Sequence, residues 1–159
     1  MEQFFSHYAH TVVFLHVLGA IVWIGGMIAV YRAVHPVMHT IEDRQLRLEK
    51  NLRITGRLFN LVLPFILLIL ATGLLMALAT DGHRGPHRNL FLAKEGIWTV
   101  MALNYAFMYY RRAKAWGRFL KGDLPGAAAL VAKIPHLLLP LNILLGITAL
   151  WLGVSLRGY

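Results

Sequence analysis

The chain has 159 residues, of which 58% are hydrophobic and only 14% are charged, a balance that excludes an ordinary soluble domain. Its formal net charge is +9, but the basic residues lie between long apolar blocks, as in membrane proteins, so we expect no nucleic-acid partner. The absence of cysteine excludes disulfides, iron–sulfur clusters and covalently attached c-type haem.

Four apolar blocks reach the length of about 20 residues that a helical membrane crossing requires. They comprise residues 11–31, 59–80, 90–110 and 134–156. The first block lacks the cationic leader and the cleavage signature of a signal peptide, so we expect it to be retained. The predicted fold class is therefore all-α, with residues 1–159 forming a single domain, an integral membrane bundle of four transmembrane helices.

Lysine and arginine cluster in the first and third connections of this predicted bundle. They are Arg32, Arg44, Arg47, Lys50, Arg53 and Arg57 in the first, and Arg111, Arg112, Lys114, Arg118, Lys121 and Lys133 in the third. Because basic connections stay in the cytoplasm, we expect a multi-pass protein of the cell inner (cytoplasmic) membrane with both termini external. Membrane lipid with anionic headgroups is the first expected partner, and the sequence leaves open a homo-oligomer.

The connections differ in their predicted structure. Residues 35–58 mix leucine and isoleucine with charged residues, which predicts either a short interfacial helix or an extension of the second span. Residues 81–89 are rich in glycine and proline and predict a loop. Residues 122–125, which contain Gly122 and Pro125, predict a break within the third connection.

His16 lies inside the first span, where an imidazole is costly unless a metal, a cofactor or a partner helix satisfies its nitrogens. On a helix His16, Ala20, Trp23 and Met27 share one face, with Gly19 at its edge. The small residues beside the ring would leave room for a flat macrocycle. Two hypotheses follow: His16 is the metal ligand of haem b with Trp23 as a cofactor contact, or His16 is hydrogen-bonded to a neighbouring helix and Trp23 is packing.

The third span opens with Lys94 and Glu95, about one helical turn from its external end. Lys94, Trp98, Met101 and Tyr105 follow helical spacing, so this polar and aromatic face should point into the bundle. Lys94 and Glu95 are the candidate catalytic residues, which would position a propionate or move protons. The alternative for Lys94 is that its long stem carries the ammonium group to the external interface.

The histidines within and next to the spans are predicted to lie at two different depths in the membrane. His16 and Lys94 fall at similar depth in the external half, so they could serve one site. His136 begins the fourth span from the cytoplasmic side, near His35 and His39, roughly half the ~30 Å hydrocarbon thickness from His16. One iron cannot bind both His16 and His136. The inner group of His35, His39 and His136 would either ligate a second haem or be hydrated at the interface.

The external surface offers a further set of candidate metal ligands. They are His7 and His10 before the first span, and His83 and His87 in the external loop. Their i,i+3 and i,i+4 spacings suit a metal if they are helical, and His10 is the candidate nearest to His16. Copper is the alternative cofactor, collected by these histidines and relayed by His16 and methionines such as Met27, Met76 or Met101, because imidazole and thioether ligands suit Cu(I).

The first span resembles that of the CopD/HemJ group of small four-helix membrane proteins. The shared pattern is His16, then Trp23, Gly25-Gly26 and Arg32. HemJ-type protoporphyrinogen oxidases have a similar spacing from His to Trp, a small-Gly pair after the Trp and an Arg at the place of Arg32. CopD-like copper-resistance proteins resemble the W-I-G-G region equally well. The resemblance implies a haem-associated role for His16 and a cofactor contact for Arg32.

The third span of HemJ-type proteins has a Lys near its start that matches Lys94, which the resemblance implies is a functional partner of His16. The similarity extends over nearly the whole chain. The chain departs from it at Ala132-Lys133, where the family typically has Asn-Glu, and at residues 29–31, which replace a Tyr-Leu-Pro run.

Three functions remain open from the sequence. The first is a b-type haem protein acting in electron transfer or oxidation; the resemblance implies oxidation of protoporphyrinogen IX, a membrane oxidoreductase activity, with electrons passed to a respiratory-chain acceptor. The second is a copper-handling membrane protein. The third is a non-catalytic accessory membrane subunit, whose polar residues only fix the register of the helices.

Overall fold

The structure, a computed structural model, describes residues 2–79 and 88–155, with side chains from His7 onward. Its helices are α1 (Glu2–Ala20), α2 (Gly26–Ala29), α3 (His35–His39), α4 (Arg44–Ala79), α5 (Arg88–Leu120), α6 (Leu124–Val131) and α7 (Leu139–Ser155). Three π-helical turns join some of them: η1 (Ile21–Gly25), η2 (Val30–Val34) and η3 (Ile134–Leu138). No strand occurs among the described residues, so the all-α prediction is confirmed there.

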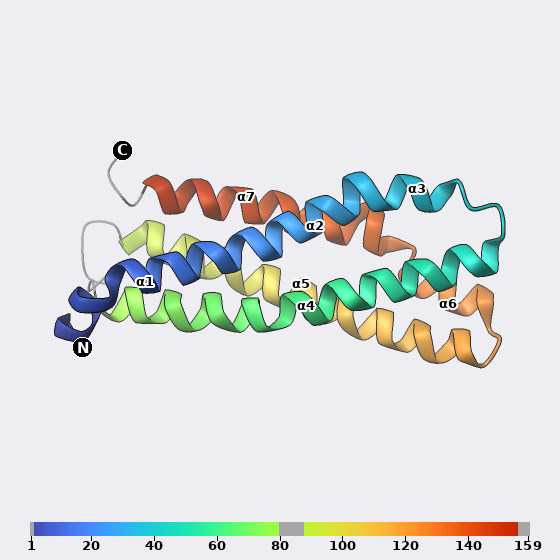
Figure 1. Cartoon of the computed structure of the whole chain (residues 1–159), viewed down its shortest axis with the longest axis horizontal. Helices are drawn as coiled ribbons and strands as arrows, with labels where there is room; N and C mark the ends of the chain where they lie inside the picture. The colour runs from blue at the N-terminus through green and yellow to red at the C-terminus, as the bar shows by residue number, and fades with distance from the viewer. Residues whose placement is uncertain (1, 80–87, 156–159) are drawn as a thin grey trace.

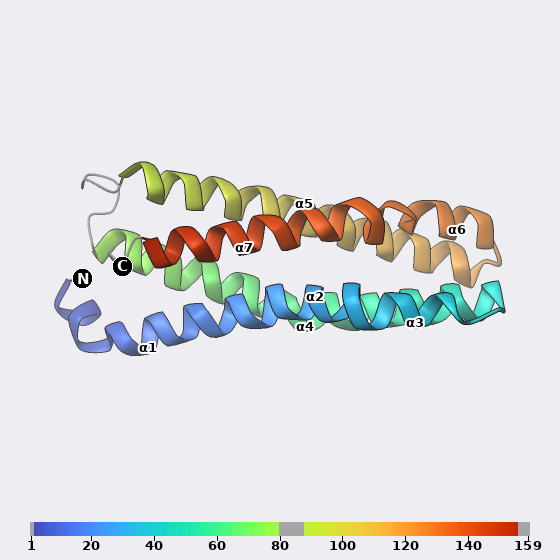
Figure 2. The same ribbon diagram turned by 90° about the horizontal axis from the view of Figure 1, so that it is seen from above.

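Four long helical runs lie side by side and alternate in direction along the bundle (Figure 1). The run from α1 to α3 lies along α4, and α5 lies along the run from α6 to α7, so the bundle consists of two helix pairs (Figure 2). The start of α1 and the end of α7 lie at one end, which we call the terminal end. The connections from α3 to α4 and from α5 to α6 lie at the opposite end, which we call the basic end.

Three runs of the described chain are long and apolar enough to cross a membrane: His7–His39, Arg44–Ala79 and Leu124–Ser155. They contain the predicted span 11–31 and all but the last residue of the predicted spans 59–80 and 134–156, whose last residues, Thr80 and Leu156, lie outside the described residues. The remaining predicted span, residues 90–110, lies within α5. This helix has 33 residues and is long enough to cross a membrane, but it is not among the three runs that are also apolar enough. Its first turns carry Arg88, Lys94 and Glu95, which lower its mean hydropathy.

Both long helices, α4 and α5, are longer than the hydrocarbon core of a bilayer is thick. With 36 residues α4 is about 54 Å long at 1.5 Å per residue, against a hydrocarbon core of about 30 Å. The first connection is thus largely an extension of the second span, one of the two predicted alternatives. The predicted break at residues 122–125 is also present: Gly122 has φ +79°, and Asp123 caps α6 by accepting a hydrogen bond from the Gly126 backbone N–H at 2.9 Å.

Glycines bring α1 and α4 close together, as expected where lipid supplies no hydrophobic drive between helices. A Cβ on Gly19 would lie 2.7 Å from Cγ1 of Ile69, and one on Gly26 would lie 3.0 Å from Cδ1 of Leu58. The room beside Gly19, which we expected to admit a macrocycle, is therefore filled by Ile69. That expectation was wrong, because the space beside a small residue in a membrane helix can be filled by a side chain of the neighbouring helix as readily as by a cofactor.

A pair of asparagines ties α5 to α7 inside the bundle. Asn104 Nδ2 donates to Asn142 Oδ1 at 2.8 Å and to the Leu138 carbonyl at 2.8 Å. Asn142 is fully buried, and its own Nδ2 donates to the Met101 carbonyl at 3.2 Å. These bonds satisfy both amides in an apolar interior, so they fix the register of the two helices.

Substituting Asn142→Leu should therefore lower the free energy of unfolding by about 1 kcal/mol, the scale of interhelical hydrogen bonds in membrane bundles. Thermal unfolding in detergent, followed by circular dichroism, measures the loss. The matched control is Thr148→Val on the same helix, because Thr148 is exposed and bonds only to the Leu144 carbonyl of its own helix. An equal change in both variants would show that the asparagine pair does not stabilise the bundle.

Candidate functional site

His16 is half-buried on α1 and is hydrogen-bonded to α4. Its Nδ1 lies 2.9 Å from Thr72 Oγ1. The Thr72 hydroxyl lies 2.6 Å from the Leu68 carbonyl and donates its single proton there. With the hydroxyl proton assigned to that carbonyl, Thr72 Oγ1 accepts from the His16 Nδ1–H, and the neutral ring keeps a lone pair on Nε2.

Two glycines define the space around the His16 ring, Gly19 on its own helix and Gly73 on α4. Ile69 fills the space next to Gly19. Gly73 lies beside the ring, since a Cβ on it would be 3.5 Å from His16 Cε1, an ordinary van der Waals contact. The backbone of α4 thus approaches the imidazole directly, and Thr72 and Gly73 together hold the orientation of the ring.

Lys94 reaches the same region from α5, since its ammonium group is close enough to His16 to act on it electrostatically. The Nζ atom also lies at the α7 backbone, because a Cβ on Gly153 would be 3.2 Å from it. His16 and Lys94, which fall at similar depth along their helices, thus lie within electrostatic range of each other, and their service in one site stays a prediction. Glu95 is different: it is exposed, and as the next residue it points about 100° away around the helix.

Two tryptophans lie near this region, Trp23, which is buried, and Trp98, which is half-buried. Trp23, in η1, is 2% exposed and packs edge-on against Tyr105 with ring centres 6.3 Å apart. The hydroxyl of Tyr105 donates to the Phe59 carbonyl at 2.7 Å. The indole N–H groups of Trp23 and Trp98 are buried with no hydrogen-bond partner among the described residues. Unpaired buried donors are uncommon, which makes these two positions candidate ligand contacts.

The inner candidates lie at the basic end, far from His16. His35 packs against His39 and His136, with ring centres 4.6 and 5.7 Å apart. His35 is 19 residues after His16, about 28 Å along the helical run. His136, next to His35, and His16 therefore lie in separate places, as predicted, but they are nearly the whole ~30 Å hydrocarbon thickness apart and not half of it. Arg32 is exposed and 16 residues from His16, about 24 Å, so it lies apart from the His16 site.

The external histidines form no assembled centre in the part of the chain that is described. His7 and His10 are exposed on α1, and His83 and His87 lie outside the described residues. Two of the methionines expected to relay copper, Met27 and Met101, are buried in the packed core. Within residues 2–79 and 88–155, no group of three His, Asp or Glu side chains is placed so that it could hold a metal ion.

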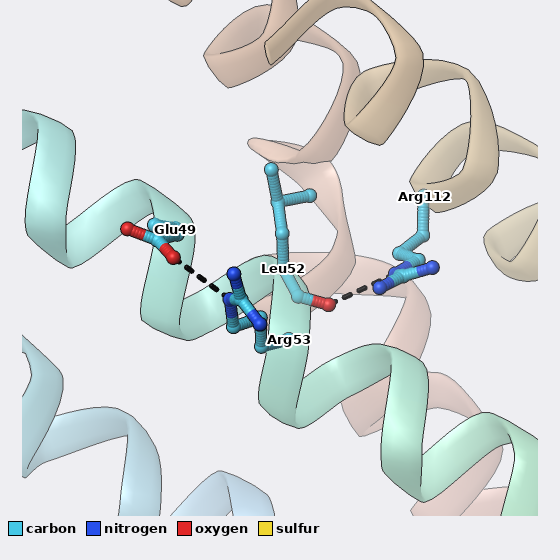
Figure 3. A network of polar contacts seen from close by, with 4 residues as sticks. All are labelled: Glu49, Leu52, Arg53 and Arg112. Atoms are coloured by element: carbon cyan, nitrogen blue, oxygen red, sulfur yellow. Dashed lines mark hydrogen bonds and ion pairs between the residues drawn. The ribbon is translucent and has the colours of Figure 1, made fainter. Parts of the chain in front are cut away.

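Arg112 crosses from α5 to α4 near the basic end (Figure 3). Its Nε donates to the Leu52 carbonyl at 2.9 Å, and its guanidinium lies directly against Gly56, where a Cβ would overlap it. Burial lowers the pKa of this guanidinium from its ordinary value, because removing a cation from water disfavours its charged form. The glycine therefore makes room for an inter-helix contact of a cation.

Trp116 is flanked by two of the basic side chains. The guanidinium groups of Arg53 and Arg112 lie 5.3 and 5.5 Å from the centre of its ring. Arg53 also pairs with Glu49 one turn earlier on α4 at 2.8 Å, an exposed contact that contributes little to stability (Figure 3). The basic end is thus held together by cation–π and backbone contacts as much as by ion pairs.

Sequence reasoning missed the partners of His16 and Lys94. Thr72, Gly73 and Gly153 are ordinary residues of apolar blocks, and nothing in their spacing connects them to another helix. A signal for Thr72 was present, since it is the one polar side chain at its depth in the second block. It could not be matched to His16 without knowing which faces of α1 and α4 meet.

The sequence matches no protein-family model, no curated protein and no solved structure.

Proposed function

We propose that the chain is an integral membrane protein that binds haem b through His16 and acts in electron transfer or oxidation. The observation that carries the proposal is the hydrogen bond of His16 to Thr72, which leaves the Nε2 lone pair for a ligand. Metal-ligating histidines almost always donate their other ring N–H to an oxygen acceptor of the protein or to water, as His16 does.

The surroundings of His16 supply the charge that haem b would need. A haem carries two propionates, and the Lys94 ammonium is a cation that acts electrostatically on His16. The half-buried position of Lys94 between α5 and α7 strengthens its interaction with an anion, because fewer waters screen it. In this proposal Lys94 binds a propionate and moves protons at the site, and the exposed Glu95 exchanges protons with water.

The membrane arrangement is part of the proposal. In it α5 also crosses the membrane, as the third of four crossings, since it lies antiparallel to α4 and α7. The basic end faces the cytoplasm of the cell, in the inner membrane, and the terminal end faces outward. His16 and Lys94 then lie in the outer half of the bilayer, where bound haem would supply one-electron chemistry.

The resemblance to HemJ-type proteins gives the proposal a more specific form. In that form the substrate is protoporphyrinogen IX, and the electrons pass to an acceptor of the respiratory chain. Lys94 would bind the substrate or cofactor carboxylates, and a proton would leave through the outer half. Copper is the less favoured cofactor, since the described residues hold no assembled set of ligands for it.

The visible spectrum of the full chain, purified in detergent, tests the proposal. We expect a Soret band in the oxidised protein and a sharpened α-band after dithionite. Reconstitution with hemin should give the same spectrum if the host supplies too little haem. A chain that stays colourless after reconstitution and takes up no haem would overturn the proposal, and copper found by elemental analysis in that preparation would favour the alternative.

A further inference from the structure

Three arginines of α4 and α5 lie together toward the basic end. Arg53 and Arg57 are one turn apart on α4, and Arg112 reaches the same turns of α4 from α5, with its guanidinium against Gly56. We call these three arginines the arginine seam. Figure 3 shows two of them, Arg53 and Arg112, next to Leu52 of α4.

The arginine seam follows one row of contacts between the two helices. At one end of the row, Asn60 Oδ1 accepts a hydrogen bond from the Tyr109 hydroxyl at 3.2 Å. At the other end, the Arg53 guanidinium lies 5.3 Å from the centre of the Trp116 ring. Arg57 is three residues from Asn60 and four from Arg53, so it shares a face of α4 with both. Arg57 therefore lies in the middle of the row, on the side of α4 that meets α5.

The cations of the arginine seam have few anions near them. Arg112 uses its Nε–H for the Leu52 carbonyl, and its other four N–H donors have no hydrogen-bond partner among the described residues. Arg57 is exposed and has no hydrogen bond or ion pair within that part of the chain. Of the described carboxylates, only Glu49 pairs with the seam, through Arg53 at 2.8 Å. Because like charges repel one another, a further anion at the seam would be stabilised.

The arginine seam lies at the depth of lipid headgroups. A close series of exposed leucines on α4 runs from Leu61 to Leu78, about 26 Å at 1.5 Å per residue, which nearly matches the ~30 Å hydrocarbon core. Arg57 is four residues, about 6 Å, beyond Leu61, and the headgroup layer on each side of the core is about 5–7 Å thick. On α5 the exposed Tyr110 comes just before Arg112, as expected of an aromatic side chain at the membrane interface.

We propose that the arginine seam binds the phosphate of one anionic phospholipid in the leaflet at the basic end. The phosphate lies between Arg57 and Arg112, because a planar guanidinium can donate two parallel hydrogen bonds to phosphate oxygens. The acyl chains run along the exposed Leu61 and Pro64, which lie one and two turns from Arg57 toward the membrane. Basic sites between transmembrane helices are a recurrent place for anionic headgroups.

The lipid site rests on the membrane arrangement of the proposed function, and it is independent of haem. Alkaline carbonate extraction of membranes that contain the wild-type chain tests the arrangement alone. A chain that carbonate releases would refute the arrangement and with it the lipid site. A chain that stays in the membrane but binds no anionic lipid would overturn only the lipid site.

Native mass spectrometry of the full chain in detergent measures the binding. Titration with phosphatidylglycerol should show one tightly bound lipid per chain, and phosphatidylcholine should bind more weakly, because its choline cation adjoins the phosphate. Arg57→Gln should weaken phosphatidylglycerol binding at least about tenfold, the scale of a hydrogen bond to a charged group. Arg57→Lys should recover only part of the affinity, since an ammonium group cannot bind phosphate in the bidentate way.

Arg44→Gln is the matched control. Arg44 is an exposed arginine at the start of the same helix, 13 residues or about 20 Å further from the membrane than Arg57, so its loss removes the same charge and should leave binding unchanged. Inorganic phosphate at the concentration of the lipid should not displace it, because phosphate has no acyl chains. Equal weakening by Arg44→Gln and Arg57→Gln, equal binding of the two lipids, or displacement by inorganic phosphate would each overturn the lipid site.

Discussion

Replacing His16 with alanine is expected to abolish most of the Soret absorbance of the protein. The variant removes the Nε2 lone pair, which is the one axial ligand that the proposal assigns. The helix itself should persist, since alanine is the best helix former and His16 makes one inter-helix hydrogen bond. The measurement is the ratio of Soret to protein absorbance after purification and again after reconstitution with hemin.

The neighbour of His16 gives a finer test of the same site. Thr72→Val keeps the shape of the side chain but removes the oxygen that accepts from His16 Nδ1. Because partners of metal-bound histidines usually contribute a factor of 10 to 100 in affinity, we expect haem to be retained about tenfold less tightly. Thr72→Ser keeps the hydroxyl and should restore retention, which a merely structural role in packing would not predict.

His10→Ala is the control for both variants, because His10 is an exposed histidine on the same helix. Its spectrum should match that of the wild type. Circular dichroism of each variant shows whether the bundle is folded. A folded His16→Ala protein with an undiminished Soret band would rule out His16 as the ligand, even if haem is present.

The second large effect is expected at the basic end, where Gly56→Ala should lower the free energy of unfolding by about 2 kcal/mol. The added Cβ would overlap the Arg112 guanidinium and push it away from the Leu52 carbonyl. Hydrogen bonds from charged groups contribute about 1.5–3 kcal/mol, and the loss outweighs the 0.5–1 kcal/mol that alanine gains over glycine in a helix. Thermal unfolding in detergent measures the difference.

Gly117→Ala is the matched control, since Gly117 is a helical glycine near the same end with no atom within 4 Å of the added Cβ. It should leave stability unchanged or raise it slightly. Combining Gly56→Ala with Arg112→Ala should cost less than the sum of the two single changes, because both act on one contact. Equal stability of Gly56→Ala and Gly117→Ala would contradict the assigned role of Gly56.

The all-helical fold was predictable because hydrophobic blocks of membrane length leave the chain few other structures. The depth of the candidate residues was predictable as well, since the rise per residue of a helix is fixed. That is why His16 and Lys94 were expected together, and why His16 and His136 were expected apart. What fills the space beside Gly19 was not predictable, because the sequence shows a glycine in either case, whether Ile69 or a cofactor occupies that space.

By itself the sequence determined what each helix is made of and how deep each polar residue lies. Only the tertiary structure decided which faces meet, and therefore that Thr72 accepts from His16, that Gly56 admits Arg112 and that three histidines from α3 and η3 adjoin. The physical reason is that helix periodicity and rise are local properties of the backbone. The rotation of one helix against another depends on side-chain packing summed over the whole bundle.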